Sequence, residues 1–402
     1  MIHGHVFVAA PLVGAIFNLN RHTPIDSNLP PPSLSFDIFC RVVDNFGDIG
    51  VCWRLARQLA DMPNGHRVRL WVDNLHRFAK IEARVDPAQD RQTVERIDLV
   101  HWTPEPPDLQ PCQVVVEAFA CDPPQGFIQR MAAEHSVWIN LEYLSAEPWV
   151  ESCHALASIH LSGLRKIFFF PGFTPHTGGL LREPHLLKTR KRWLSEPGNA
   201  QALRRALRLP DNLSQSLQKG DCRQVFLFCY PSAPALGLLQ GLAHDPTPSV
   251  ILVPAGVYPR LEASQTPHVH VHEIPFVDQT TFDQVLWSSD LNCVRGEDSL
   301  VRAMWAGKPF LWQIYPQNED AHLVKLQAWL AQTSFSPAVQ ALMQAWNGDT
   351  HASVGALVSR LLSVPAWSEW QRDTRLWTEK MAQQPDLASS LLRLCVKLLQ
   401  TG

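Results

Sequence analysis

The chain has 402 residues, of which 46% are hydrophobic and 18% charged, and its formal net charge is −3. This length suggests two domains, and the composition is typical of a globular protein rather than a disordered one. The charge argues against non-specific nucleic-acid binding, which needs a strongly basic face. Nine irregularly spaced cysteines without a CxxC pair predict reduced thiols in the cytoplasm. No run of 18 apolar residues occurs, so no membrane-spanning helix is expected.

Residues 1–35 do not follow the pattern of the rest of the chain. An apolar stretch follows a short lead, as in a signal peptide, but Pro11 interrupts it and the lead contains no Lys or Arg. We favour a flexible extension, or a start codon assigned too far upstream, over a signal peptide.

From Phe36 the sequence alternates between strand and helix patterns. FDIFCRVV predicts a strand, and the stretch 49–61 predicts a helix with Val51, Leu55 and Leu59 near one face. HRVRLWV, CQVVVEAF and SVWINLEYL are typical of strands buried on both faces of a parallel sheet. We therefore expect a Rossmann-like domain over residues 36–190.

A second, similar domain is expected over residues 220–380. Pro/Gly clusters and a basic run before it predict a domain crossover, with a linker region over 191–219. CRQVFLFCY, PSVILVPA, VHVHEI, DLNCVR and KPFLWQIY are its strand candidates. The helical stretch within 381–402 could pack back on the first domain. The expected fold is α/β, with two Rossmann-like domains facing each other across a cleft.

The motif RGEDS at 295–299 lies between a predicted strand and a predicted helix that ends at Gly307. Asp298 or Ser299 can cap this helix. The free N–H groups at the helix start, with Arg295 beside them, suit a diphosphate. Glu297 would then bond sugar hydroxyls or orient the donor. A capping turn with a local Arg–Glu pair explains the motif about equally well.

Asp44 and Asp48 lie in the loop after the first strand, on either side of Gly47. Two carboxylates match the hydrogen-bonding fork of an arginine guanidinium. Arginine is a poor nucleophile, so chemistry on it needs carboxylates that align one nitrogen and accept its proton. Capping of the following helix is the alternative, and spacing alone favours it.

Aromatic and polar residues of the second domain suggest a nucleobase pocket, because ring faces stack on bases and a glutamine amide can read a pyrimidine edge. Each of them alone is more common in a core than in a pocket. The candidates are Phe228, Tyr230, Phe276, Gln279 and Phe282.

Three histidines alternate along PHVHVHEIP, at 268, 270 and 272. Such alternation can bind zinc, but a solvent-facing strand explains it as well, and no further ligand is evident. We therefore expect no metal.

Five motifs occur in the order FDIFCRVVDNFGDIGVCWRLARQLA, INLEYLSAEPWVE, FFFPGFTPHTGGLLRE, FLFCY and RGEDS. Together they resemble the bacterial protein-arginine rhamnosyltransferases that modify translation elongation factor P, the EarP family. The resemblance runs from about Phe36 to the C-terminus. It implies a GT-B fold and transfer of L-rhamnose from dTDP-β-L-rhamnose to an arginine of elongation factor P, with inversion and without a metal or other cofactor.

The resemblance also implies roles for individual residues. Asp44 would be the general base or the arginine clamp, Asp48 would assist it, and Glu297 would be essential in donor placement. The diphosphate and nearby groups would be held by Arg295, Asp298, Ser299 and Tyr315. The thymidine pocket would consist of Phe228, Tyr230, Phe276, Gln279 and Phe282. Other substrate contacts are expected at Asn45, Phe46, Gly47 and Gly296.

Two other functions remain possible at this point. One is a GT-B transferase with a lipid or small-molecule acceptor, although the aspartate pair and the lack of an amphipathic membrane segment argue against it. The other is a non-enzymatic module that only docks elongation factor P, and such a module would not bind a nucleotide sugar. Neither nucleic acid nor membrane is expected as a partner.

Overall fold

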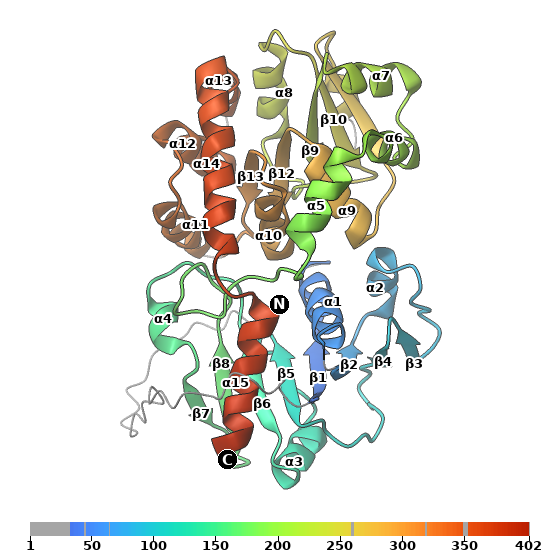
Figure 1. Cartoon of the computed structure of the whole chain (residues 1–402), viewed down its shortest axis with the longest axis vertical. Helices are drawn as coiled ribbons and strands as arrows, with labels where there is room; N and C mark the ends of the chain where they lie inside the picture. Colours follow the sequence, from blue (N-terminus) through green and yellow to red (C-terminus); the bar gives the residue numbers. More distant parts are fainter. Residues whose placement is uncertain are drawn as a thin grey trace. The chain divides into compact units, whose positions relative to one another are not determined.

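The structure is a computed structural model that describes residues 33–43, 46–63, 65–258, 261–317, 320–348 and 353–401. Figure 1 shows the arrangement of their helices and strands. Most of the expected extension 1–35 lies outside these residues, as do Asp44 and Asn45 of the first loop. No helix within the described ranges combines the length and the apolar character needed to cross a membrane.

The first sheet has eight strands in the order β3-β4-β2-β1-β5-β6-β8-β7. The six inner strands are parallel, and the edge strands β3 and β7 pair antiparallel with their neighbours. The strands are β1 Ser35–Cys40, β2 Arg67–Val72, β3 Arg91–Val94, β4 Ile97–His101, β5 Val114–Ala118, β6 Val137–Leu141, β7 Ala157–Ile159 and β8 Arg165–Phe169. The strands expected from apolar runs are all present, because burial on both faces requires such runs.

Four helices accompany this sheet: α1 Gly47–Ala60, α2 Leu75–Ile81, α3 Gln125–Ala133 and α4 Trp149–Cys153. Helix α1 begins two residues before the expected Ile49 and ends one residue before Asp61. Its start at Gly47 brings Asp48 into the first turn of the helix.

The second sheet has five parallel strands in the order β11-β10-β9-β12-β13. They are β9 Arg223–Leu227, β10 Ser249–Pro254, β11 Val269–Ile274, β12 Leu291–Arg295 and β13 Phe310–Gln313, and all five match expected strands. Strand order reverses beside β9 here and beside β1 in the first sheet. Ligands of doubly wound sheets bind at such switch points, just past the carboxyl ends of the strands. This rule singles out the loops after β1, β5, β9 and β12.

The helices that follow β8 belong mostly with the second sheet. The expected linker 191–219 is helical, and α5 and α6 pack against α9. Their bounds are α5 Leu186–Ser195, α6 Pro197–Ala206, α7 Asp211–Lys219, α8 Ala235–Ala243, α9 Gln279–Ser288, α10 Gly296–Ala306, α11 Ala321–Gln332, α12 Pro337–Asn347, α13 Val354–Leu361 and α14 Val364–Ala382. A short 3₁₀ helix spans Leu261–Ser264.

The last helix, α15 Leu387–Thr401, returns to the first sheet and contacts α1 and β6. Figure 1 shows α14 beside α10 and α15 beside α1. Leu387 and Leu391 are buried in the core of the first sheet. We call β1–β8, α1–α4 and α15 the N-terminal half, and β9–β13 with α5–α14 the C-terminal half.

Candidate active site

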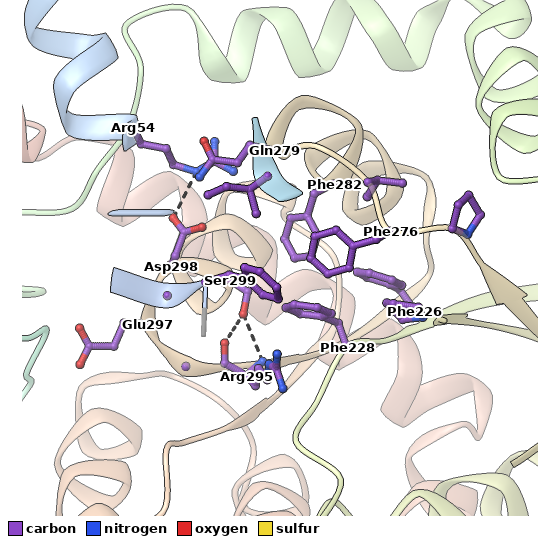
Figure 2. Close-up of a pocket in the computed structure, with 17 residues that line it drawn as sticks. Arg54, Phe226, Phe228, Phe276, Gln279, Phe282, Arg295, Glu297, Asp298 and Ser299 are labelled. Atoms are coloured by element: carbon purple, nitrogen blue, oxygen red, sulfur yellow. Dashed lines mark hydrogen bonds and ion pairs between the residues drawn. The ribbon is translucent and has the colours of Figure 1, made fainter. Parts of the chain in front are cut away.

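Residues from both halves line a first cavity with about 710 Å³ of empty space, part of it open solvent. The N-terminal half contributes the start of α1 and one residue of α2. The C-terminal half contributes residues near the carboxyl ends of β9, β10 and β12 and residues of the segment after β11. The lining residues include Phe46, Gly47, Arg54, Phe226, Phe228, Phe276, Gln279, Phe282, Arg295, Gly296, Glu297, Asp298 and Ser299. Figure 2 shows this cavity.

Aromatic rings form one wall of the first cavity. Phe228 stacks on Phe226 with ring centroids 6.0 Å apart and meets Phe282 edge-on at 5.1 Å. Phe46 of the N-terminal half contacts Phe276 at 4.8 Å. The structure thus brings together the expected pocket residues Phe228, Phe276 and Phe282. It adds Phe226, which shares a face of the strand with Phe228 because the two are separated by one residue.

Tyr230 does not line the first cavity but lies behind it. The guanidinium of Arg295 packs over the rings of both Phe228 and Tyr230, at 4.8 and 4.7 Å. These cation–π contacts hold the arginine against the aromatic wall at the end of β12.

Gln279 is buried at the start of α9, with 7% of its surface exposed. Its amide Nε2 donates to the carbonyl oxygen of Gly50 in α1 at 3.0 Å. Its Oε1 is buried and has no hydrogen-bond partner among the described residues. Because a buried acceptor without a partner is costly, this oxygen suits an N–H donor from a ligand in the cavity.

The turn 295–299 differs in one respect from the expectation. Helix α10 starts at Gly296, so Arg295, not Asp298 or Ser299, occupies the cap position, and its side chain does not cap the helix. Gly296 has φ +60°, a left-handed conformation that favours glycine. The Ser299 hydroxyl accepts from the Arg295 N–H at 3.2 Å and donates to the Arg295 carbonyl.

Glu297 and Asp298 point in different directions. The Oε2 of Glu297 accepts the Leu144 N–H of the N-terminal half at 2.8 Å. Figure 2 shows Glu297 directed away from the aromatic rings, whereas Asp298 faces Arg54. The two neighbouring carboxylates therefore have different partners, a backbone N–H for Glu297 and a guanidinium for Asp298.

A buried ion network connects α1 with α9 and α10. Arg54 of α1 lies 3.2 Å from both Asp298 and Asp283, and Arg302 of α10 lies 2.6 Å from Asp283 and 2.7 Å from Glu183. Burial raises the pKa of Asp298 despite Arg54 and Arg302. Burial would also raise the pKa of Glu183, but the two arginines outweigh it and hold this pKa at about 2. Arg54 and Arg302 were not expected in the site from the sequence, because only the packing of the helices brings them to these acids.

A second cavity, with about 790 Å³ of empty space, shares Gly47, Gly296 and Glu297 with the first. Its other lining residues include Val43, Asp48, Phe119, Tyr143, Leu144, Trp312, Tyr315 and Lys325. Tyr315 therefore belongs to this cavity, and its ring meets Tyr230 at 5.7 Å. Phe119, Tyr143 and Lys325 also line this cavity and were not expected from the sequence.

Asp48 is buried at the edge of the second cavity, with 3% of its surface exposed. Its Oδ2 accepts the Val43 N–H at 2.8 Å, so it reaches back across the loop that contains Asp44 and Asn45. The contact ties the two ends of this loop together.

Within the described ranges, no group of three or more His, Cys, Asp or Glu residues is arranged to hold a metal ion. Of the alternating histidines, His272 lies with its Nε2 3.2 Å from the Leu207 carbonyl oxygen.

The chain matches a family model over residues 36–396, and that family is described as Elongation-Factor P (EF-P) rhamnosyltransferase EarP. A protein-arginine rhamnosyltransferase from Pseudomonas aeruginosa is 40% identical over 380 residues, covering 89% of this chain and 98% of the relative. One from Pseudomonas putida is 42% identical over 382 residues, covering 89% and 97%. The chain is also similar to a solved structure described as the structural basis for EarP-mediated arginine glycosylation of translation elongation factor EF-P. It has a TM-score of 0.58 and 30% identity, covering 90% of this chain and 98% of that one. The fold is GT-B, as expected.

Proposed function

Because the chain belongs to the EarP family of elongation factor P rhamnosyltransferases, we propose that it transfers L-rhamnose from dTDP-β-L-rhamnose to an arginine of elongation factor P. One observation carries the proposal: an aromatic cavity suited to a nucleobase adjoins a carboxylate-lined cavity suited to a guanidinium. The two meet at Gly47, Gly296 and Glu297.

The thymidine would occupy the first cavity. The rings of Phe228, Phe276 and Phe282 offer faces for stacking on the base. The ring imide N–H of thymine is a donor, and the unpaired Oε1 of Gln279 would accept it.

The diphosphate would lie at the junction of β12 and α10. Arg295 supplies a guanidinium, and the first turn of α10 supplies backbone N–H groups that a helix leaves unpaired. The side chains of Asp298 and Ser299 are engaged with Arg54 and with the Arg295 backbone. We therefore assign their part in diphosphate binding to main-chain N–H groups, with Tyr315 approaching from the second cavity.

The chemistry would be a single displacement with inversion. A guanidinium nitrogen attacks the anomeric carbon, the bond from this carbon to the diphosphate oxygen breaks, and dTDP leaves with the electron pair. Asp44 takes the nitrogen's proton as the new bond forms. Asp48 holds the loop through Val43, and Arg295 with the α10 N-terminus stabilises the departing charge. Glu297, fixed by Leu144, orients the sugar between the cavities.

The test is intact-mass analysis of elongation factor P after incubation with this protein and dTDP-rhamnose. We expect a gain of one deoxyhexose, located on arginine. Asp44→Asn has the same size but cannot accept the proton, so it should retain dTDP-rhamnose binding by calorimetry and lose transfer by about 10²-fold or more. A near wild-type rate for this variant would refute the assignment of the base.

The two alternative functions give different results in the same assays. A transferase for a lipid or small molecule would leave the mass of elongation factor P unchanged and label the other acceptor. A docking module would release no heat with dTDP-rhamnose. We place the reaction in the cytoplasm, because all nine cysteines are free thiols.

A further inference from the structure

Two aromatic rings stack on each other at the second cavity. The Phe119 and Tyr143 ring centroids are 4.4 Å apart, with planes inclined by 16°. Phe119 directly follows β5, and Tyr143 lies two residues after β6. These strands are parallel neighbours, and their carboxyl ends face the switch point beside β1. The pair therefore lies where doubly wound sheets bind ligands.

The backbone that presents Phe119 is strained. Phe119 has φ +59° and Ala120 has φ +51°, a left-handed conformation in which a bulky residue is an outlier. The surrounding structure enforces it: the Phe119 N–H donates to the Leu141 carbonyl at 2.7 Å, and the Ala120 N–H donates to Asn140 Oδ1 at 3.2 Å. The Asn140 amide in turn donates to Glu142 at 2.6 Å. Strain kept in place by a dedicated network is typical of binding sites.

The cavity around the pair suits a cation. Asp48 and Glu297 line it with the aromatic rings, and Lys325 is the basic residue among its described lining residues. Tyr143 keeps 39% of its surface exposed although it belongs to a stacked pair. A flat guanidinium stacked on such a pair keeps all its N–H groups in its own plane, free to reach carboxylates at the edge.

We propose that Phe119 and Tyr143 form a platform that receives the guanidinium of the acceptor arginine. This inference rests on the proposed function and adds an acceptor-binding element to it. The platform fixes the plane of the guanidinium, and the carboxylates that line the cavity, Asp48 and Glu297, then select one nitrogen within that plane. It also favours arginine over lysine, because a lysine ammonium has no flat face to stack.

The experiment measures acceptor KM for elongation factor P and, separately, dTDP-rhamnose Kd by calorimetry. Tyr143→Leu keeps an apolar side chain but removes the aromatic face, and should raise acceptor KM roughly five- to thirtyfold. The donor Kd should change less than about twofold, because Tyr143 does not line the first cavity. Tyr143→Phe restores the ring and should recover most of the lost affinity.

A second variant separates the aromatic face from the backbone. Asparagine tolerates the left-handed conformation better than phenylalanine, so Phe119→Asn should keep the loop while removing the ring. It should raise acceptor KM as Tyr143→Leu does, and it should lower the melting temperature somewhat, because the Phe119 ring packs against the core of the first sheet. Trp149→Leu is the matched control, because Trp149 is 51% exposed and is not among the residues that line either cavity.

The outcomes are distinguishable. Unchanged acceptor KM in Tyr143→Leu and Phe119→Asn, with transfer by the wild type, overturns the inference and leaves the proposed function standing. A loss of donor affinity as large as the loss of acceptor affinity in both variants also overturns it. The aromatic pair would then support the donor site as well, and would not be specific to the acceptor arginine. Absence of transfer by the wild type overturns the proposed function, and the inference with it.

Discussion

Closely spaced residues around the start of α10 face different parts of the molecule. Arg295 packs on the aromatic wall, Glu297 bonds to Leu144 of the N-terminal half, and Asp298 pairs with Arg54. At a helix start, successive side chains diverge by about 100°. One short turn can therefore present a cation, a carboxylate and a structural ion pair to three different surroundings, and in the proposed function the first two would hold the diphosphate and orient the sugar.

A histidine outside the site should contribute to the pH dependence of stability. Burial lowers the pKa of His154 to about 4 from the ordinary 6.5, and its Nδ1 accepts the Phe170 N–H at 3.1 Å. As the pH falls, the His154 imidazole becomes protonated near pH 6.5 in the unfolded chain but only near pH 4 in the folded chain. This stabilisation is therefore complete above pH 6.5 and is lost as the pH falls toward 4.

The check is thermal unfolding of wild type and His154→Asn across this pH range. Asparagine can still accept the Phe170 N–H but does not titrate. We expect the wild type to lose melting temperature more steeply than the variant between pH 6.5 and 4. Parallel curves would show that His154 titrates normally in the folded state.

At the scale of elements, one face of α1 joins the two halves. Gly47, Gly50 and Arg54 lie on this face, at spacings of three and four residues. Gly47 lines both cavities, Gly50 accepts from Gln279, and Arg54 pairs with Asp298 and Asp283. The helix that follows the Asp44 loop is thereby held in register with the proposed donor site.

Gly50→Ala should test this register. The added Cβ would lie 3.2 Å from Asp298 Oδ2 and 3.3 Å from Gln279 Nε2, and neither can retreat easily because both are bonded. Alanine favours the helix by about 1 kcal/mol, but the crowding should outweigh this at the site. We expect dTDP-rhamnose Kd to rise roughly fivefold or more by calorimetry.

The control is Gly126→Ala in α3, where the nearest atom to the added Cβ is Arg130 Nη1 at 3.8 Å. This variant has the same helix-propensity gain without crowding, so its donor Kd should match that of the wild type. Unchanged donor binding in Gly50→Ala would mean that the contact between α1 and the C-terminal half can shift to accommodate the added Cβ without disturbing the donor site.

At the scale of the whole described chain, the polypeptide crosses between the two halves after β8 and again after α14. These two crossover segments are hydrogen-bonded to each other. Arg182, after β8, donates to the Ala382 and Gln384 carbonyls at the end of α14, at 2.7 and 3.0 Å. Gln58 of α1 donates to Asp386 at 2.6 Å. We propose that the two halves are separate domains. The sequence places them over 36–190 and 220–380, and the helices of the expected linker 191–219 belong with the second, because α5 and α6 pack against α9. The segment 381–402 would complete the first domain.

Leu391→Ala should measure what α15 contributes. Leu391 is fully buried in the core of the first sheet, so truncation leaves a cavity and should cost about 2–5 kcal/mol. A clear fall in melting temperature is the expected readout. Arg393→Ala on the exposed side of α15 is the control and should shift it little. Equal effects of the two substitutions would mean that α15 docks only loosely.

The apolar runs of β1, β2, β5, β6 and the five strands of the second sheet, and the RGEDS turn, were readable from the sequence, since strand burial and helix starts depend on neighbours along the chain. The inner strands β4 and β8 were not predicted. The exposed edge strand β7 and the pairs across the halves were not either. In the sequence, Arg54 is indistinguishable from other charged residues on a helix, and Phe119 is indistinguishable from a residue at the end of a buried strand.

The sequence by itself determined the nature of the fold, the position of β1, β2, β5, β6 and β9–β13 along the chain and, through five motifs, the family. Only the tertiary structure decided that Asp298 pairs with Arg54 and that Phe119 stacks on Tyr143. The physical reason is that such contacts join segments far apart in the chain, and their existence depends on how helices and sheets pack, which local patterns do not encode.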